Sequence, residues 1–271
     1  MTTRGSVSTP VDLPTSFRLD GRVAVVIGGT GTIGSRIAEA IADAGARTVI
    51  VGRDAAHADA ALGRLQSRAR DVTFEACDAS VRSELRRLLE NILASHRRVD
   101  VLVNGAGTNS ATPFLEISDD ELERIVSVNE LAVMRACQEF GRYFVERATS
   151  SGEGASIINI GSASGLTPLS QVFTYSMTKA AVHNLTKNLA REWGPIGIRC
   201  NVLVPGFFPA EQNRAILTRS RTAEILRHTP IGRFGEVDEL AGAALLLASD
   251  AGRFITGTEL VVDGGFSAMS I

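Results

Sequence analysis

The sequence predicts one α/β domain in which helices cover both faces of a parallel, seven-stranded, doubly wound sheet. Short apolar runs rich in β-branched residues alternate with helical patterns throughout the 271 residues. This alternation is typical of parallel strands joined by right-handed crossovers. No repeat or linker divides the chain, and one domain of this class often reaches this length.

The predicted strands are apolar runs of the kind that parallel sheets bury on both faces. In chain order they cover residues 22–28, 47–52, 72–78, 99–107, 155–161, 198–204 and 259–262. Helical patterns cover residues 35–45, 81–95, 119–147 and 174–193. We expect residues 17–271 to form the domain and residues 1–16, rich in Ser, Thr and Pro, to form a flexible arm.

The first strand runs into the turn Gly28-Gly-Thr-Gly-Thr-Ile-Gly34, which an Ala-rich helix follows. Strand, glycine turn and helix are the context of a dinucleotide-binding fingerprint. Glycines let the backbone approach a pyrophosphate, and the helix amino terminus offers N–H groups to the anion. The predicted contacts are Gly28, Thr30, Gly31, Thr32, Ile33 and Gly34.

The end of the second strand indicates which dinucleotide is bound. An acidic residue commonly binds the ribose hydroxyls of NAD here, but this chain has Gly52 followed by Arg53. A guanidinium suits the 2′-phosphate of NADP, so we favour NADP over NAD. In the alternative, Arg53 is a surface cation and Asp54 contacts the ribose.

The third and fourth strands end in further candidate contacts. Asp78 is placed to accept a hydrogen bond from the adenine amino group, or else to cap the helix that follows. Asn104, Gly105 and Ala106 end the fourth strand, and small residues there allow an adenosine to lie against the backbone.

The chemistry is indicated by Ser162, Tyr175 and Lys179. Tyr175 and Lys179 are four residues apart in a predicted helix and therefore share a face. A cation beside the phenol would lower its pKa from about 10 toward the working pH. Ser162 follows a buried strand, where its hydroxyl would share the oxygen that Tyr175 protonates. By itself the Tyr/Lys pair is more typical of a half-buried tyrosine beside a solvated lysine, and the other motifs of the chain favour the catalytic interpretation.

With these motifs in this order, residues 18–271 resemble the short-chain dehydrogenase/reductase family, a Rossmann-type fold. The resemblance implies that Tyr175 is the acid/base and that Ser162 positions the substrate carbonyl. It also implies that Lys179 binds the nicotinamide ribose and that Asn129 supports a proton relay through water. Pro205 and Gly206 begin the segment that lines the nicotinamide face in the family.

Three positions depart from the family pattern. Thr32 replaces the usual second glycine of the turn, and Gly105 replaces a frequent asparagine. Ala210 occupies the place where many members have a threonine that contacts the carboxamide. None of these departures removes a group of the expected chemistry.

The segment at about residues 206–233 follows a strand end and should fold over the site as a lid. Its Gln212, Asn213 and Arg214 offer amide and guanidinium donors that suit hydroxyls and a carboxylate. The segment resembles a sugar-acid branch of the family, which includes D-mannonate (fructuronate) oxidoreductases and gluconate 5-dehydrogenase-like enzymes. The alternatives are a 3-oxoacyl thioester reductase and a non-catalytic nucleotide-sensing regulator.

The composition gives no indication of a nucleic-acid or membrane partner, so we expect a small-molecule substrate. A net charge of −2 gives no support for nucleic-acid binding, and the three cysteines have no metal or disulfide spacing. We expect no metal site, and His183 is interpreted as a surface or packing residue. Without a membrane-length apolar run or a signal-peptide pattern, the sequence predicts a cytoplasmic enzyme. The resemblance implies a homotetramer, or a homodimer, built on the long helices.

Overall fold

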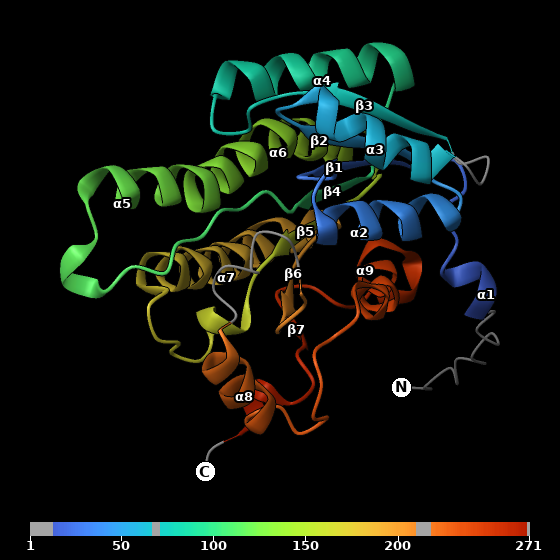
Figure 1. Ribbon diagram of the computed structural model, residues 1–271. Helices are drawn as coiled ribbons and strands as arrows, with labels where there is room; N and C mark the ends of the chain where they lie inside the picture. Colours follow the sequence, from blue (N-terminus) through green and yellow to red (C-terminus); the bar gives the residue numbers. More distant parts are fainter. Residues whose placement is uncertain (1–12, 67–70, 210–217, 270–271) are drawn as a thin grey trace, which may run out of the picture.

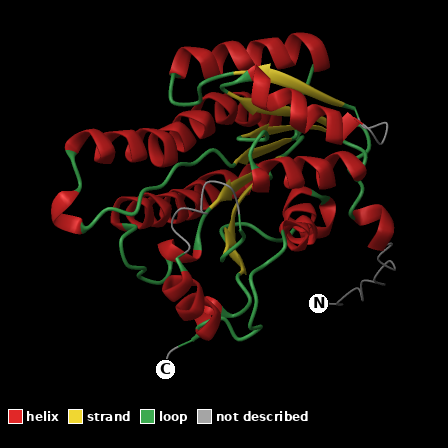
Figure 2. Ribbon diagram, viewed as in Figure 1, coloured by secondary structure: helices red, strands yellow, loops and turns green. Residues whose placement is uncertain are grey.

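The computed structural model describes residues 13–66, 71–209 and 218–269, which form a parallel sheet covered by helices on both faces (Figures 1 and 2). The strands lie in the order β3-β2-β1-β4-β5-β6-β7. They are β1 (Val23–Ile27), β2 (Arg47–Gly52), β3 (Val72–Ala76), β4 (Val101–Asn104), β5 (Ala155–Ile160), β6 (Ile198–Pro205) and β7 (Glu259–Val262). The predicted fold class is confirmed. The order reverses between β1 and β4, where open α/β sheets bind ligands.

Two helical layers enclose the sheet. The helices are α1 (Leu13–Ser16), α2 (Thr32–Asp43), α3 (Ala55–Gln66), α4 (Arg82–His96), α5 (Asp119–Val126), α6 (Ala132–Ser151), α7 (Phe173–Trp193), α8 (Arg219–Arg227) and α9 (Ala241–Ala248). Helices α4, α6 and α7 share one buried apolar core, while α2, α3 and α9 share the other. No helix in the described ranges is long and apolar enough to span a membrane.

Strand β1 is buried on both faces, which explains why its residues are apolar throughout instead of alternating between apolar and polar. Val23, Val25 and Ile27 pack into the core with α4, α6 and α7, whereas Ala24 and Val26 pack into the core with α2 and α9. Successive side chains of a strand point to opposite faces, and here both faces are buried.

Some predicted boundaries differ from the structure. Helix α1 occupies Leu13–Ser16, the last four residues of the segment 1–16 that was expected to be a flexible arm. Residues 1–12 lie outside the described part of the chain. The helix predicted over 119–147 extends to Ser151, and a π-helical turn at Ser127–Leu131 interrupts it.

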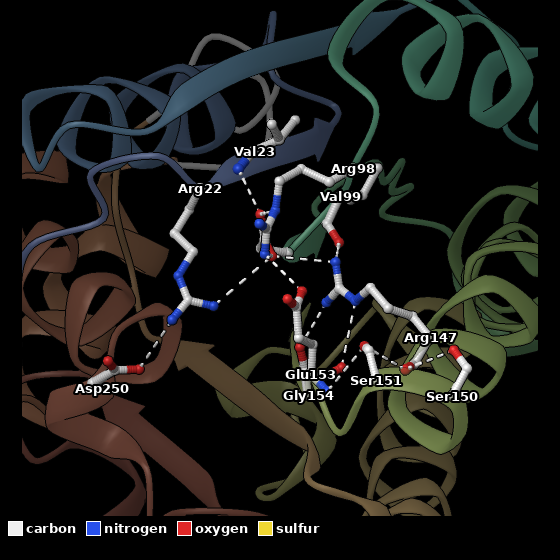
Figure 3. Close-up of polar contacts among 11 residues, drawn as sticks. Arg22, Val23, Arg98, Val99, Arg147, Ser150, Ser151, Glu153, Gly154 and Asp250 are labelled. Atoms are coloured by element: carbon white, nitrogen blue, oxygen red, sulfur yellow. Dashed lines mark hydrogen bonds and ion pairs between the residues drawn. The ribbon is translucent and has the colours of Figure 1, made fainter.

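An ion-pair network lies at the amino-terminal ends of the central strands (Figure 3). Asp100, directly before β4, is 2% exposed and accepts from Arg98 at 2.6 Å and Arg147 at 3.2 Å. Its other oxygen accepts from the Val23 backbone N–H at 2.9 Å. Arg22 bridges Asp100 to the exposed Asp250. One buried carboxylate therefore ties β1, β4 and α6 together at the edge opposite the strands' carboxyl ends.

Candidate active site

A cleft of about 510 Å³ lies at the carboxyl ends of the central strands, where the strand order reverses. Most of the residues predicted to bind a cofactor or substrate line it. They are Gly28, Thr30, Gly31, Thr32, Ile33, Gly34, Arg53, Asp78, Gly105, Ala106, Ser162, Tyr175, Lys179, Pro205 and Gly206. The structure thus brings together groups that are up to 178 residues apart, from Gly28 to Gly206 (206 − 28).

Part of the cleft is bare backbone at positions where a side chain has no room. Gly28 has a φ of +79°, and a Cβ there would lie 2.6 Å from the Ala106 nitrogen. A Cβ on Gly34 would lie 2.1 Å from the Gly28 oxygen. Helix α2 begins at Thr32 with no side-chain cap, so its first N–H groups are available to an anion. This cradle fits the pyrophosphate of a nicotinamide dinucleotide.

The end of β2 carries a glycine in place of the acidic residue that NAD sites commonly carry. A Cβ on Gly52 would lie 2.7 Å from the Thr30 hydroxyl oxygen, so a larger residue would require the Thr30 side chain, which lines the cleft, to shift. Arg53 is exposed at the cleft. The pKa of Asp78 is lowered overall: burial raises it, hydrogen bonds from Ser80 lower it, and the nearby charge of Arg53 lowers it further.

Asp78 is held in a tight turn and does not cap the following helix. Its Oδ1 accepts from the Ser80 backbone N–H at 2.9 Å and from the Ser80 hydroxyl at 2.6 Å. Helix α4 begins at Arg82 without a side-chain cap. The carboxylate lines the cleft, so the predicted adenine contact stays a prediction.

Asn104 lies behind the cleft wall rather than on it. Its side chain is 2% exposed and donates to Asn159 Oδ1 at 2.8 Å and to the Cys137 thiol at 3.5 Å. The phase of β4 turns this side chain toward β5 and α6, since strand residues alternate between faces. Asn104 is not among the residues that line the cleft, whereas Gly105 and Ala106 are, so the predicted cofactor contact of Asn104 stays a prediction.

Asn129 also lies just outside the cleft, within the π-helical turn. Its side chain is fully buried; Oδ1 accepts from the Thr108 N–H at 2.8 Å and Nδ2 donates to the Thr108 oxygen at 2.9 Å. A Cβ on Gly107 would lie 3.5 Å from Asn129 Oδ1 and 3.8 Å from Lys179 Nζ. Gly107 therefore lies next to both the Asn129 amide and the Lys179 ammonium, and π-helical turns recur at functional sites.

Ser162 and Tyr175 meet at one wall of the cleft. Ser162 directly follows Gly161 at the end of β5, and its hydroxyl accepts from the Ser164 N–H at 3.2 Å and the Ser164 hydroxyl at 3.0 Å. Burial raises the pKa of Tyr175, and a hydrogen bond with the Ser162 hydroxyl acts in the opposite direction. The phenol therefore stays protonated at neutral pH, as a proton donor requires.

Lys179 lies one turn further along α7 and is 4% exposed. Its Nζ donates to the Ile160 oxygen at 2.8 Å and lies 5.6 Å from the centroid of the Tyr175 ring. Burial lowers the pKa of Lys179 to about 8, so the ammonium form still prevails at pH 7. The pKa of Tyr175 is raised rather than lowered, because burial of the phenol outweighs the hydrogen bond with Ser162.

A smaller pocket of about 90 Å³ opens beside Tyr175 and Ser162. Its walls combine polar groups with aromatic and aliphatic ones. They include Asn109, Ser164, Leu169, Val172, Phe207, Phe208, Pro209, Arg221 and Phe234. The guanidinium of Arg221 reaches across from α8 and donates to the Ser170 oxygen at 3.1 Å. A substrate bound here would have its carbonyl oxygen next to the phenol.

The predicted lid is represented by α8, which contributes Arg221 to this pocket. Gln212, Asn213 and Arg214 lie outside the described residues, so their predicted substrate contacts stay a prediction. Asn109, Ser164, Arg221 and Phe234 were not predicted as contacts. Only Ser164 carried a usable signal, because it lies two residues after Ser162.

A fold and cleft of this kind are those of nicotinamide-dependent oxidoreductases. A family model described as enoyl-(acyl carrier protein) reductase matches residues 28–267. The chain belongs to the short-chain dehydrogenase/reductase family, and it is an oxidoreductase acting on CH–OH donors.

Individual relatives extend over nearly the whole chain. Galactitol 2-dehydrogenase (L-tagatose-forming) of Cereibacter sphaeroides is 38% identical over 261 residues, which cover 95% of this chain and 99% of the relative. A rhamnolipid-biosynthesis 3-oxoacyl-[acyl-carrier-protein] reductase of Pseudomonas aeruginosa is 36% identical, with 92% of this chain and 98% of the relative covered.

Among solved structures, a gluconate 5-dehydrogenase from Burkholderia cenocepacia in complex with NADP and tartrate superposes with a TM-score of 0.89. It is 33% identical and is covered completely by 95% of this chain. The non-catalytic regulator considered from the sequence finds no support among these enzymes.

Proposed function

We propose that this oxidoreductase interconverts the ketone and the secondary alcohol of a small sugar acid or polyol, with NADP as the preferred cofactor. The observation that carries the proposal is the pocket beside Tyr175, which is small and offers Asn109, Ser164 and Arg221 as hydrogen-bonding groups. Hydroxyls and a carboxylate match these groups. Relatives named for galactitol and gluconate support the same substrate class.

In the proposed mechanism, a bound nicotinamide would supply or accept the hydride, and Tyr175 donates or accepts the proton. Tyr175 donates its proton to the carbonyl oxygen during reduction and recovers it during oxidation. The Ser162 hydroxyl holds the same oxygen, which fixes its distance from the phenol. Lys179 binds the nicotinamide ribose, and its ammonium favours the phenolate once the proton has left. Asn129 supports a proton relay through water.

A substrate panel tests the proposal directly. Sugar acids, polyols, their ketones and a 3-oxoacyl thioester are supplied with NADP(H) or NAD(H), and turnover is followed by nicotinamide absorbance. We expect turnover of a sugar acid or a polyol pair. Turnover confined to the thioester would contradict the proposal and establish the 3-oxoacyl reductase instead, which the Pseudomonas aeruginosa relative favours.

Arg221→Ala distinguishes a sugar acid from a neutral polyol. Loss of one partner of a buried charge pair costs about 2–5 kcal/mol, so KM for a sugar acid should rise well over tenfold. KM for the cofactor should hardly change. Arg227→Ala, on the same helix but exposed and outside the pocket, is the matched control. Arg214→Ala tests the lid cation that was predicted from the sequence. Unchanged KM and kcat for the sugar acid in both the Arg221 and the Arg214 variant would remove the case for carboxylate recognition.

The preference for NADP is attributed to Arg53. A charge-assisted hydrogen bond is worth roughly 1.5–3 kcal/mol, so Arg53→Ala should weaken NADP binding by about one to two powers of ten. NAD binding should be nearly unchanged, because NAD lacks the 2′-phosphate. Titration of cofactor fluorescence measures both affinities, with the exposed Arg253→Ala as control. An equal loss for the two cofactors would mean that Arg53 contributes only to structure.

We further propose a homotetramer, or a homodimer, built on α5, α6 and α7. Apolar side chains on these helices are exposed, with Leu122 at 36%, Met134 at 43% and Met177 at 52%. Burial of such groups against a second copy would favour association. A monomer in light scattering at micromolar concentration would contradict this proposal.

A further inference from the structure

His183 lies one turn after Lys179 on α7, directly beneath the loop that carries Ser162. Its side chain is 3% exposed, so of the two alternatives predicted from the sequence, a surface or a packing residue, the packing one holds. A Cβ on Gly161 would lie 2.2 Å from His183 Nε2, and one on Gly165 would lie 3.2 Å from Cε1. The two glycines allow the ring to pack against bare backbone on either side of Ser162.

The ring accepts a hydrogen bond from the loop. The Ser162 backbone N–H donates to His183 Nε2 at 3.3 Å, which requires Nε2 to carry no proton. In a neutral imidazole the proton then resides on Nδ1. Nδ1 is buried without an aligned hydrogen-bond partner among the described residues, and it lies 3.3 Å from Glu259 Oε1.

Glu259 is held in turn by Lys187, whose Nζ lies 2.8 Å from the same oxygen. Glu259 begins β7, whereas Ser162 follows β5. A continuous series of polar contacts therefore runs from Lys187 through Glu259 and His183 to the backbone of Ser162. The carboxylate at Nδ1 favours the tautomer in which Nε2 accepts.

We propose that His183 is a positioning residue: it holds Ser162 through Nε2, and Glu259 selects the tautomer that makes this possible. The inference rests on the proposed role of Ser162. The Gly161 N–H is anchored to Leu203 on β6, so the His183 contact is the next anchor along the loop. Without it, the Ser162 N–H would lose its acceptor, and the hydroxyl would move relative to Tyr175.

This arrangement depends on pH. The charged groups that face His183 are Glu259 from β7 and Lys179 and Lys187 from its own helix, while the loop side presents only the backbone of Gly161, Ser162 and Gly165. Burial lowers the pKa of His183, Glu259 opposes this, and the two lysines reinforce it. The ring is therefore neutral at pH 7. Protonation of Nε2 below the ordinary value of 6.5 would remove the acceptor, and kcat would fall.

Two substitutions at His183 separate positioning from packing. In His183→Gln, the side-chain oxygen can still accept from Ser162 but cannot titrate, whereas His183→Leu fills the space without an acceptor. We expect His183→Leu to lower kcat by about 10- to 100-fold, because small displacements of reacting groups have effects of this order. His183→Gln should restore most of the loss and remove the fall of kcat at acid pH. Cofactor affinity should stay unchanged in both.

Kinetics are measured in the reduction direction with whichever carbonyl the substrate panel identifies. Tyr175 must be protonated in that direction, so the acid side of the profile is free of its titration. Glu259→Gln should move the fall of kcat to lower pH, because the carboxylate that raises the His183 pKa is gone. Ser156→Ala, which removes a buried hydroxyl at the opposite end of β5, is the control for a loss of stability alone.

A substrate-independent measurement completes the test. Nitrogen NMR of the imidazole should show the proton on Nδ1 at pH 7. A proton on Nε2, wild-type kcat in His183→Leu, or a glutamine variant no better than leucine would each overturn the proposal. Failure of the sugar-acid assignment would leave this NMR result intact, so the two failures can be told apart.

Discussion

Tyr175→Phe is expected to reduce turnover to a small fraction of the wild-type rate while cofactor binding persists. The substitution removes only the phenolic oxygen and its proton, and positioned acid/base groups contribute about 10²–10⁴-fold. The ring still packs beside Lys179, so the cleft should keep its shape. Steady-state kinetics on the best substrate of the panel measure kcat, and fluorescence titration measures NADP binding.

Lys179→Ala provides the comparison for this variant. Because Lys179 is proposed to contact the ribose as well as the phenol, its loss should reduce both turnover and cofactor affinity. Loss of a positioned acid/base group should lower kcat to about a hundredth of the wild-type value or less. A Tyr175→Phe enzyme that keeps more than about a tenth of the wild-type kcat would therefore show that another group supplies the proton.

Asp100→Ala is expected to have the largest effect on stability. The substitution leaves Arg98 and the nearly buried Arg147 without their shared carboxylate, and the Val23 N–H without its acceptor. Removal of one partner of a buried ion pair costs about 3–5 kcal/mol. Equilibrium unfolding in denaturant measures the loss. Turnover of the folded fraction should be unchanged, because the network lies at the opposite edge of the sheet from the cleft.

Asp250→Ala is the matched control within the same network. Asp250 pairs with Arg22 at 3.7 Å, but its side chain is 70% exposed. Exposed pairs contribute about 0–1 kcal/mol, so this variant should unfold nearly as the wild type does. An equal effect of the two substitutions would mean that burial of Asp100 does not determine the strength of the network.

The five inner strands were predictable because strands buried on both faces of a parallel sheet require uninterrupted apolar runs, and β1 illustrates the rule. The ends of strands were less predictable. The runs predicted over 72–78 and 99–107 include residues that leave the sheet to line the cleft, such as Asp78 and Ala106. Helix α9 was not singled out, because its residues are apolar around nearly the whole circumference and give no helical period.

Within the candidate site, the sequence identified the groups whose role depends on residues close to them in the chain. The glycine turn, Arg53 after β2, and the Tyr175/Lys179 spacing each act through neighbours a few residues away. The direction of a side chain could not be predicted from such local patterns. The Asn104 amide points behind the cleft, and the Asn129 amide, in a π-helical turn, is hydrogen-bonded to the backbone of Thr108.

The sequence by itself determined that a dinucleotide cradle and a phenol–ammonium pair exist, because each is contained in one strand–turn–helix or one helical turn. Only the tertiary structure decided the pocket beside Tyr175, which joins Asn109, Ser164 and Arg221 from separate segments. It also decided that His183 contacts Ser162 on one side and Glu259 on the other. Contacts of this kind depend on how the sheet and its helical layers pack, and packing between distant segments leaves no period or spacing in the chain.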